Sequence, residues 1–140
     1  MKLSPGQKDF KLAPIRGFLS NSPLVGIGYG TGAGGGVNQG VGRTTGVTLN
    51  TITGRITTDT ASLAAEASAN FTVTNSAVDI QDTVVVSIRS GSNGGNTAVT
   101  VDTVATGSFV IKVANNNAAA GAAETGAILI NFCVIKGVDS

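Results

Sequence analysis

Five stretches of the chain alternate apolar and polar residues with a period of two. In one of them, Phe71 and Val73 fall on one face while Asn70, Thr72 and Thr74 fall on the other. Such alternation is typical of a β-strand with one buried face. The strands predicted in this way are 68–75, 83–90, 97–105, 108–115 and 127–136.

Shorter signals complete the predicted fold. Weaker strands are expected at 47–50 and 55–58, and turn-forming residues fill 90–96, 105–107 and 115–126. Many short strands joined by such turns predict an all-β fold, an antiparallel β-sandwich of about seven or eight strands, Ig-like or jelly-roll-like. Segment 58–68 is the one helix-like piece: Thr60 or Ser62 would cap it, and it is long enough for a turn or two.

Some predicted strands also carry apolar residues on the face that should meet water. The last strand, 127–136, is apolar on both faces, which indicates burial on two sides or at a subunit contact. We therefore predict an oligomer interface, with a covering loop as the alternative. Its residues are Val85, Val110, Leu129 and Ile135. The single Cys133 in this strand is interpreted as a small core hydrophobe.

The chain ahead of these strands has a different character. We divide the protein into an extended N-terminal arm, 1–25, a glycine-rich linker, 26–46, and a β-sandwich domain, 47–140. The linker holds 10 glycines in 21 positions, and Gly30, Gly32 and Gly35 match the dinucleotide-binding pattern G-x-G-x-x-G. That pattern needs a helix directly after the loop, and the residues that follow are poor helix formers. The tract is therefore interpreted as a flexible joint.

The arm is basic and carries apolar anchors. Residues 1–36 have a net charge of +3, and the remainder has a net charge of −2. We expect the arm to dock on an acidic partner surface, with packing on its own domain as the alternative. The predicted partner-binding residues are Phe10, Leu12, Ile15, Arg16, Phe18 and Leu19, with Arg16 as the polar clamp.

Composition argues against several classes of function. The 140 residues contain no His and one Cys, which removes His-based catalysis and the usual zinc sites. Asp79 and Asp82 form the one close acidic pair; a calcium site or a carboxylate dyad is the alternative to a simple polar turn. Because these sets of residues are missing, we expect no enzyme activity, no cofactor and no metal. The few Lys and Arg are scattered, so we also expect no nucleic-acid partner. No secretory signal or apolar membrane span is recognised, so synthesis in the cytoplasm is expected.

The sequence from about Gly46 to Lys136 resembles small virion proteins of tailed bacteriophages. The resemblance lies in "TTGVTLNTITGRITTDTASLAAEASANFTVTNSAVDIQDTVVVSIRSG", "TVDTVATGSFVIKVAN" and "ETGAILINFCVIK", preceded by "GTGAGGGVNQ". It implies a structural component of the virion and supplies no catalytic residue. The first hypothesis is a capsid decoration or head-fibre protein on the outer capsid surface, a homotrimer bound to the major capsid protein through its arm. The alternative is a receptor- or glycan-binding module of a tail fibre or spike, with a host-surface glycan as partner.

Overall fold

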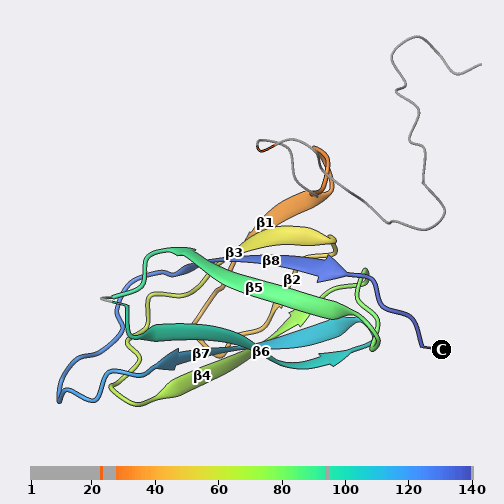
Figure 1. The fold of residues 1–140 in the computed structure, drawn as a ribbon. Coiled ribbons are helices and arrows are strands. Elements are labelled where there is room, and N and C mark those ends of the chain that lie inside the picture. Colours follow the sequence, from red (N-terminus) through yellow and green to blue (C-terminus); the bar gives the residue numbers. More distant parts are fainter. Residues whose placement is uncertain (1–22, 24–27, 94, 140) are drawn as a thin grey trace, which may run out of the picture.

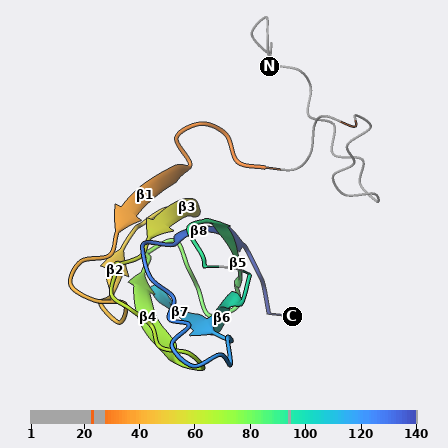
Figure 2. The same ribbon diagram turned by 90° about the vertical axis from the view of Figure 1, so that its left-hand side faces the viewer.

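Two four-stranded sheets packed face to face form the body of the protein (Figures 1 and 2). The computed structural model describes residues 23, 28–93 and 95–139, and these contain strands and no helix. The strands are β1 (Gly34–Asn38), β2 (Val47–Thr48), β3 (Thr53–Thr57), β4 (Ser68–Thr74), β5 (Thr83–Ser90), β6 (Thr97–Ala105), β7 (Ser108–Asn115) and β8 (Leu129–Ile135). The prediction of an all-β sandwich is confirmed.

The strand order is β1-β3-β8-β5 in one sheet and β2-β4-β7-β6 in the other. Four of the strand pairs are antiparallel, as predicted. The pairs β1–β3 and β2–β4 are parallel, so both sheets are mixed and the strictly antiparallel prediction is wrong at these two edges. The two-residue connection between β6 and β7 is the predicted tight hairpin, and Gly107 occupies it with φ of 83°.

The core lies between the sheets and follows the period-two pattern. Inward positions of β4, β7 and β8 are buried, while their neighbours along the strand face outward. Phe109 of β7 and Phe132 of β8 meet across the gap, with ring centroids 5.4 Å apart and planes tilted by 54°. Each such buried aromatic or branched side chain contributes about 1.5–3 kcal/mol relative to an exposed one. This inter-sheet contact joins one central strand of each sheet.

Part of the predicted linker 26–46 belongs to the sandwich. Gly34–Asn38 form the edge strand β1, so the β-structure starts ahead of the predicted boundary at residue 47. Gln39, which follows β1, is buried, and its amide donates to the carbonyls of Arg43 and Thr45 at 2.8 Å each. Its side-chain oxygen accepts from the N–H of Asp59 at 3.0 Å. These bonds hold the loop after β1 against the body, so this part of the tract is a packed element.

Arg43 fixes the same loop from the inside. Its side chain is 5% exposed and donates to the carbonyls of Ala61, Glu124 and Gly126 and to the hydroxyl of Thr58. Burial lowers the pKa of Arg43 from its ordinary value, and the charges of Glu124 and Asp59 oppose that shift. A buried guanidinium needs such acceptors, because an unpaired charge in the interior is costly. Arg43 thereby links the segment after β1 to the loops before β4 and β8.

The helix predicted within 58–68 does not form. Leu63 is buried instead, and its backbone exchanges hydrogen bonds of 2.9 and 2.8 Å with Glu124. A turn closed by the bond from the N–H of Ala67 to the carbonyl of Ala64 follows, with Glu66 at φ of 60°. The alanine-rich composition favoured a helix, but so short a segment gains more from burying Leu63 and pairing its backbone with a neighbouring loop.

Gly54 is the point of closest approach inside the β1-β3-β8-β5 sheet. A Cβ at this position would lie 2.7 Å from Cδ2 of Leu49 and 2.8 Å from Cε1 of Phe132. On the adjacent strand, a Cβ at Gly35 would lie 2.8 Å from Cδ1 of Leu49. Because neither glycine has a side chain, Leu49 and Phe132 pack into the space beside them.

We expect Gly54→Ala to destabilise the domain by about 1–3 kcal/mol, because the added methyl overlaps two packed side chains. Guanidinium unfolding followed by circular dichroism measures the loss. Gly40→Ala is the matched control, because a Cβ there has no neighbour within 4 Å and should leave stability nearly unchanged. Equal unfolding midpoints for Gly54→Ala and the wild type would contradict this packing role.

Candidate functional site

The outer face of the β1-β3-β8-β5 sheet carries the candidate site. Strand register places Arg55 of β3, Asn131 of β8 and Ser87 of β5 side by side in one row across the sheet. All three side chains are exposed. Such a cross-strand row presents its side chains on the same face, with neighbouring strands about 4.8 Å apart.

A hollow of about 420 Å³ lies over this face. Besides the polar row, it is lined by Thr53, Cys133 and Val85, which form the adjacent row in the register. Gly34 and Gly35 of β1 contribute backbone and no side chain to its wall. The hollow thus joins a polar row, a more apolar row and a glycine strand at one place on the sheet.

The guanidinium of Arg55 lies over the glycine strand. A Cβ built at Gly36, its register partner on β1, would meet Nη2 of Arg55 at 3.4 Å. Arg55 therefore rests against the backbone of β1, in space that a side chain at Gly36 would restrict. The hydroxyl of Thr53, by contrast, is used internally and donates to the carbonyl of Phe132 at 2.8 Å.

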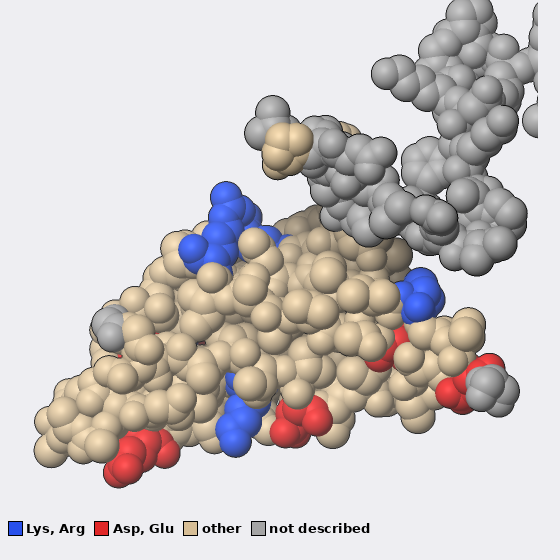
Figure 3. All heavy atoms as spheres, viewed as in Figure 1, with Lys and Arg blue, Asp and Glu red and all other residues tan. Residues whose placement is uncertain are grey.

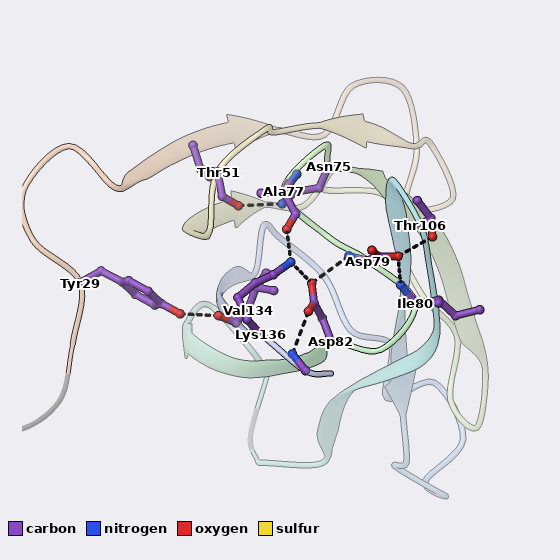
Figure 4. A network of polar contacts seen from close by, with 11 residues as sticks. Tyr29, Thr51, Asn75, Ala77, Asp79, Ile80, Asp82, Thr106, Val134 and Lys136 are labelled. Carbon is purple, nitrogen blue, oxygen red and sulfur yellow. Dashed lines mark hydrogen bonds and ion pairs between the residues drawn. The ribbon is translucent and has the colours of Figure 1, made fainter. Parts of the chain in front are cut away.

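Tyr29 lies near the Cys133 end of the hollow. Its hydroxyl donates to the carbonyl of Val134, the residue that follows Cys133 in β8 (Figure 4). The neighbouring N–H of Val134 donates to the carbonyl of Ile52 at 2.8 Å, just before β3 begins. Tyr29 therefore caps the ladder where β3 and β8 part, and it ties the chain ahead of β1 to the central strand β8.

The four predicted interface residues do not form one patch. Val85 and Ile135 are exposed near one end of the β5–β8 pair, where Val85 pairs with Cys133 and Ile135 with Thr83. Leu129 is half-buried at the opposite end of β8. Val110 is half-buried on the other sheet, between β4 and β6. The structure thus brings together Val85 and Ile135 and separates them from the other two.

Two further apolar residues lie toward the end that holds Ile135. Ile80, in the turn before β5, is 60% exposed, and Val138, after β8, is 93% exposed. The C-terminal segment runs beside that turn, because Gln81 donates to the carboxylate of Asp139 at 2.9 Å. We call Ile80, Val85, Ile135 and Val138 the apolar end of the sandwich; it lies where β8 runs out to the C-terminus (Figure 1).

The last strand has one buried face. Positions 130, 132 and 134 are buried, whereas Asn131 and Ile135 are exposed and Cys133 is half-buried. Within this chain, the prediction of burial on two sides is therefore wrong, and Cys133 lines the outer hollow instead of the core. Asn131 is the polar residue on this otherwise apolar outer face of β8.

The acidic pair predicted as a polar turn forms part of a bonded network (Figure 4). The carboxylate of Asp82 is buried, pairs with Lys136, and accepts the N–H groups of Asp79 at 2.8 Å and Gly137 at 3.0 Å. Lys136 also donates to the carbonyl of Ala77 at 3.0 Å. The network ties the segment after β8 to the turn before β5 and has a structural role.

Both carboxylates of this turn are easier to ionise than usual. Lys136, together with the N–H groups of Asp79 and Gly137, lowers the pKa of Asp82 to about 2. The hydroxyl of Thr106, which donates to the Asp79 carboxylate at 2.6 Å, and the N–H of Ile80 lower the pKa of Asp79. In each case the donors favour the charged form over the neutral one.

Other sequence predictions concern charge, metal binding and the arm. Charged side chains stand as isolated spots on the face drawn in Figure 3. Among residues 28–93 and 95–139, no three His, Cys, Asp or Glu side chains gather as a set for a metal ion, and no helix has the length and apolarity to cross a membrane. The predicted partner-binding residues Phe10, Leu12, Ile15, Arg16, Phe18 and Leu19 lie outside the described residues.

Comparison with models of protein families gives no match, and neither the curated proteins nor the solved structures contain a match to this chain. Function is therefore inferred from the chain's own geometry.

Sequence reasoning missed the hollow and its polar row. Period two places Asn131 and Ser87 on the outer faces of their strands, which the pattern contains. That Arg55 stands in the same row follows only from the register of β3, β8 and β5. A motif of consecutive residues could not have revealed it.

Because the pKa of Asp82 is lowered, the free energy of unfolding should depend on pH in the acidic range. Because the folded pKa, about 2, is below the ordinary value of about 3.9, ionised Asp82 stabilises the folded state above about pH 4, and this contribution is lost as pH falls toward 2. We expect Asp82→Asn to lower stability at pH 7 and to flatten the fall in stability between about pH 5 and 2. Urea unfolding across that range measures both effects.

Asp102→Asn is the control for this acid dependence, because it removes one exposed carboxylate on β6, away from the Lys136 network. An Asp82→Asn protein whose unfolding free energy follows the wild type between pH 5 and 2 would show that the pair with Lys136 has no linkage to folding.

Proposed function

We propose that this chain is a structural protein of a bacteriophage virion: an oligomeric decoration or head-fibre protein on the outer capsid surface. Its partner is the major capsid protein, reached by the N-terminal arm, and a second partner is its own copy. The observation that carries the proposal is the exposed apolar end of the sandwich. The resemblance to small virion proteins supports the same reading of the chain.

The apolar end favours self-association. Ile80, Val85, Ile135 and Val138 are 60, 47, 54 and 93% exposed. Exposed apolar groups gathered at one place, next to polar strand faces, are typical of a contact between proteins. Burying them against neighbouring copies removes this surface from water, and a closed ring of three copies is the assembly we expect. Val110 and Leu129 lie away from this end and are omitted from the proposed contact.

The described residues ahead of β1 lie close to the apolar end. Residues 28–33 lead into β1, which is one edge of its sheet, while β5 of the apolar end is the opposite edge. The hydroxyl of Tyr29 in this segment donates to the carbonyl of Val134, the residue before Ile135 of the apolar end. Several arms in one oligomer would add their individually weak contacts.

Purified virions test the proposal. We expect mass spectrometry of the particles to detect the protein in high copy number, and immunogold labelling to place it on the head. A chain beginning at residue 28, which keeps Tyr29 and β1, should fold but fail to bind heads, whereas the full chain binds. Labelling confined to the tail, or absence from purified particles, would overturn the proposal.

The subunit contact has its own test. Ile135→Asp places a charge in the apolar end and should weaken self-association by roughly tenfold or more, because a buried Ile contributes about 1.5–3 kcal/mol. Light scattering after size exclusion measures the oligomer. Val41→Asp is the control, since Val41 is 96% exposed and belongs to the loop after β1. Equal oligomer fractions for both variants would remove the apolar end from the interface.

A further inference from the structure

We propose that the hollow on the β1-β3-β8-β5 sheet binds a carboxylate-bearing saccharide. Arg55 would hold the carboxylate, while Asn131 and Ser87 would bind neighbouring hydroxyl groups of the same sugar. The hollow adjoins the apolar end and shares Val85 with it, and the inference does not depend on attachment to a capsid. It gives the receptor-binding alternative a site and a class of ligand.

The first argument is that Arg55 takes part in no ion pair among the described residues. Within residues 28–93 and 95–139, the single ion pair joins Lys136 and Asp82, so Arg55 has no carboxylate partner there. Its guanidinium lies over Gly36 at the wall of the hollow and presents donors in a flat fork. That fork matches the two oxygens of a carboxylate, and such charge-assisted pairs are the stronger kind of hydrogen bond.

The second argument is the row of polar side chains beside that charge. Asn131 and Ser87 follow Arg55 across β8 and β5 at the spacing of neighbouring strands, about 4.8 Å. A carboxamide both donates and accepts, and a hydroxyl does the same, so each can bind the hydroxyl of a sugar. A guanidinium followed by two such groups suits a molecule that has one carboxylate and several hydroxyls in line.

The shape of the hollow supports the same class of ligand. Its volume of about 420 Å³ is within the range of small-molecule sites, about 300–1,000 Å³. Val85 and Cys133 provide an apolar row against which the C–H groups of a sugar ring can pack. The glycines of β1 keep the opposite wall low, because a side chain at Gly34 would project beside Thr53 and one at Gly36 would project beside Arg55.

The same residues argue against other ligands. Phe132 is the one aromatic residue lining the hollow, and its side chain is 2% exposed, so the lining offers no ring face for stacking a neutral sugar. Tyr29 lies outside the lining, with its hydroxyl bonded to the carbonyl of Val134. A phosphate group carries up to two charges, whereas the lining contains a single cation. One negative charge with neighbouring hydroxyls is the chemistry that fits.

Titration of the full-length protein with two acidic probes tests the proposal. The probes are sialyllactose and trigalacturonic acid, and their uncharged counterparts are lactose and the methyl ester of trigalacturonic acid. We expect saturable binding of at least one acidic probe. Its uncharged counterpart should bind with an affinity lower by about tenfold or more. Amide resonance shifts at Asn131 and Ser87 should saturate with the same constant. Failure of both acidic probes to bind, or equal binding of the uncharged counterparts, would overturn it.

Two arginine variants separate the site from general charge effects. Arg55→Gln should weaken binding about tenfold or more, whereas Arg89→Gln removes the same charge from an exposed position of β5 outside the lining. Arg55→Lys should recover part of the affinity, because a lysine keeps the charge and loses the fork. Equal losses in the Arg55→Gln and Arg89→Gln proteins, with unchanged thermal unfolding, would show that net charge and not the hollow holds the ligand.

The outcome is separable from that of the proposed virion role. The uncharged Ile135→Asn protein, which also alters the apolar end, should bind the acidic probe with unchanged affinity, because Ile135 is outside the lining of the hollow and the change adds no charge beside it. Loss of probe binding in that variant would place the ligand at the subunit contact and overturn an independent site on the sheet.

Discussion

The sandwich depends on the close approach of Phe132 and Leu49 to the backbone at Gly54. Phe132 belongs to the central strand β8 and meets Phe109 of the opposite sheet, so its position sets how the two sheets face each other. Leu49 lies between the glycines of β1 and β3, at positions where any Cβ would be within 2.8 Å of its methyl groups. Close packing of this kind tolerates little added volume, which is why glycine is required in these two strands.

The same glycines shape the outer surface. Alternation along β1 directs Gly35 toward the core and Gly34 and Gly36 toward the outer face. Inside, the lack of a side chain makes room for Leu49; outside, it leaves a low wall over which the guanidinium of Arg55 lies. One short glycine strand therefore accounts for both the tight core and the open hollow. A glycine-rich segment of this kind differs from a flexible tether, because its neighbours and its hydrogen bonds fix it.

The sequence predicted those elements whose side chains carry the signal. β4, β7 and β8 each have one row of large apolar residues, and Phe71, Phe109 and Phe132 mark the buried side of each. β1 has the sequence GGGVN, so it lacks the alternation that identifies a strand, and only its pairing with β3 makes it one. The parallel pairs also escaped prediction, since local periodicity holds no information about which strands become neighbours. The hollow needed the register of three strands for the same reason.

Buried polar groups explain why such a neutral chain takes up one arrangement. Arg43 and Gln39 satisfy carbonyls of three separate loops, and no buried side-chain nitrogen or oxygen among the described residues is left without a partner. Each of these bonds requires a particular register of the loops, whereas apolar contacts tolerate small slips. Polar groups used internally in this way are not available to a partner. Arg55, Asn131 and Ser87 differ from them, because they are exposed and share one face, and it is this difference that makes them the candidates for binding.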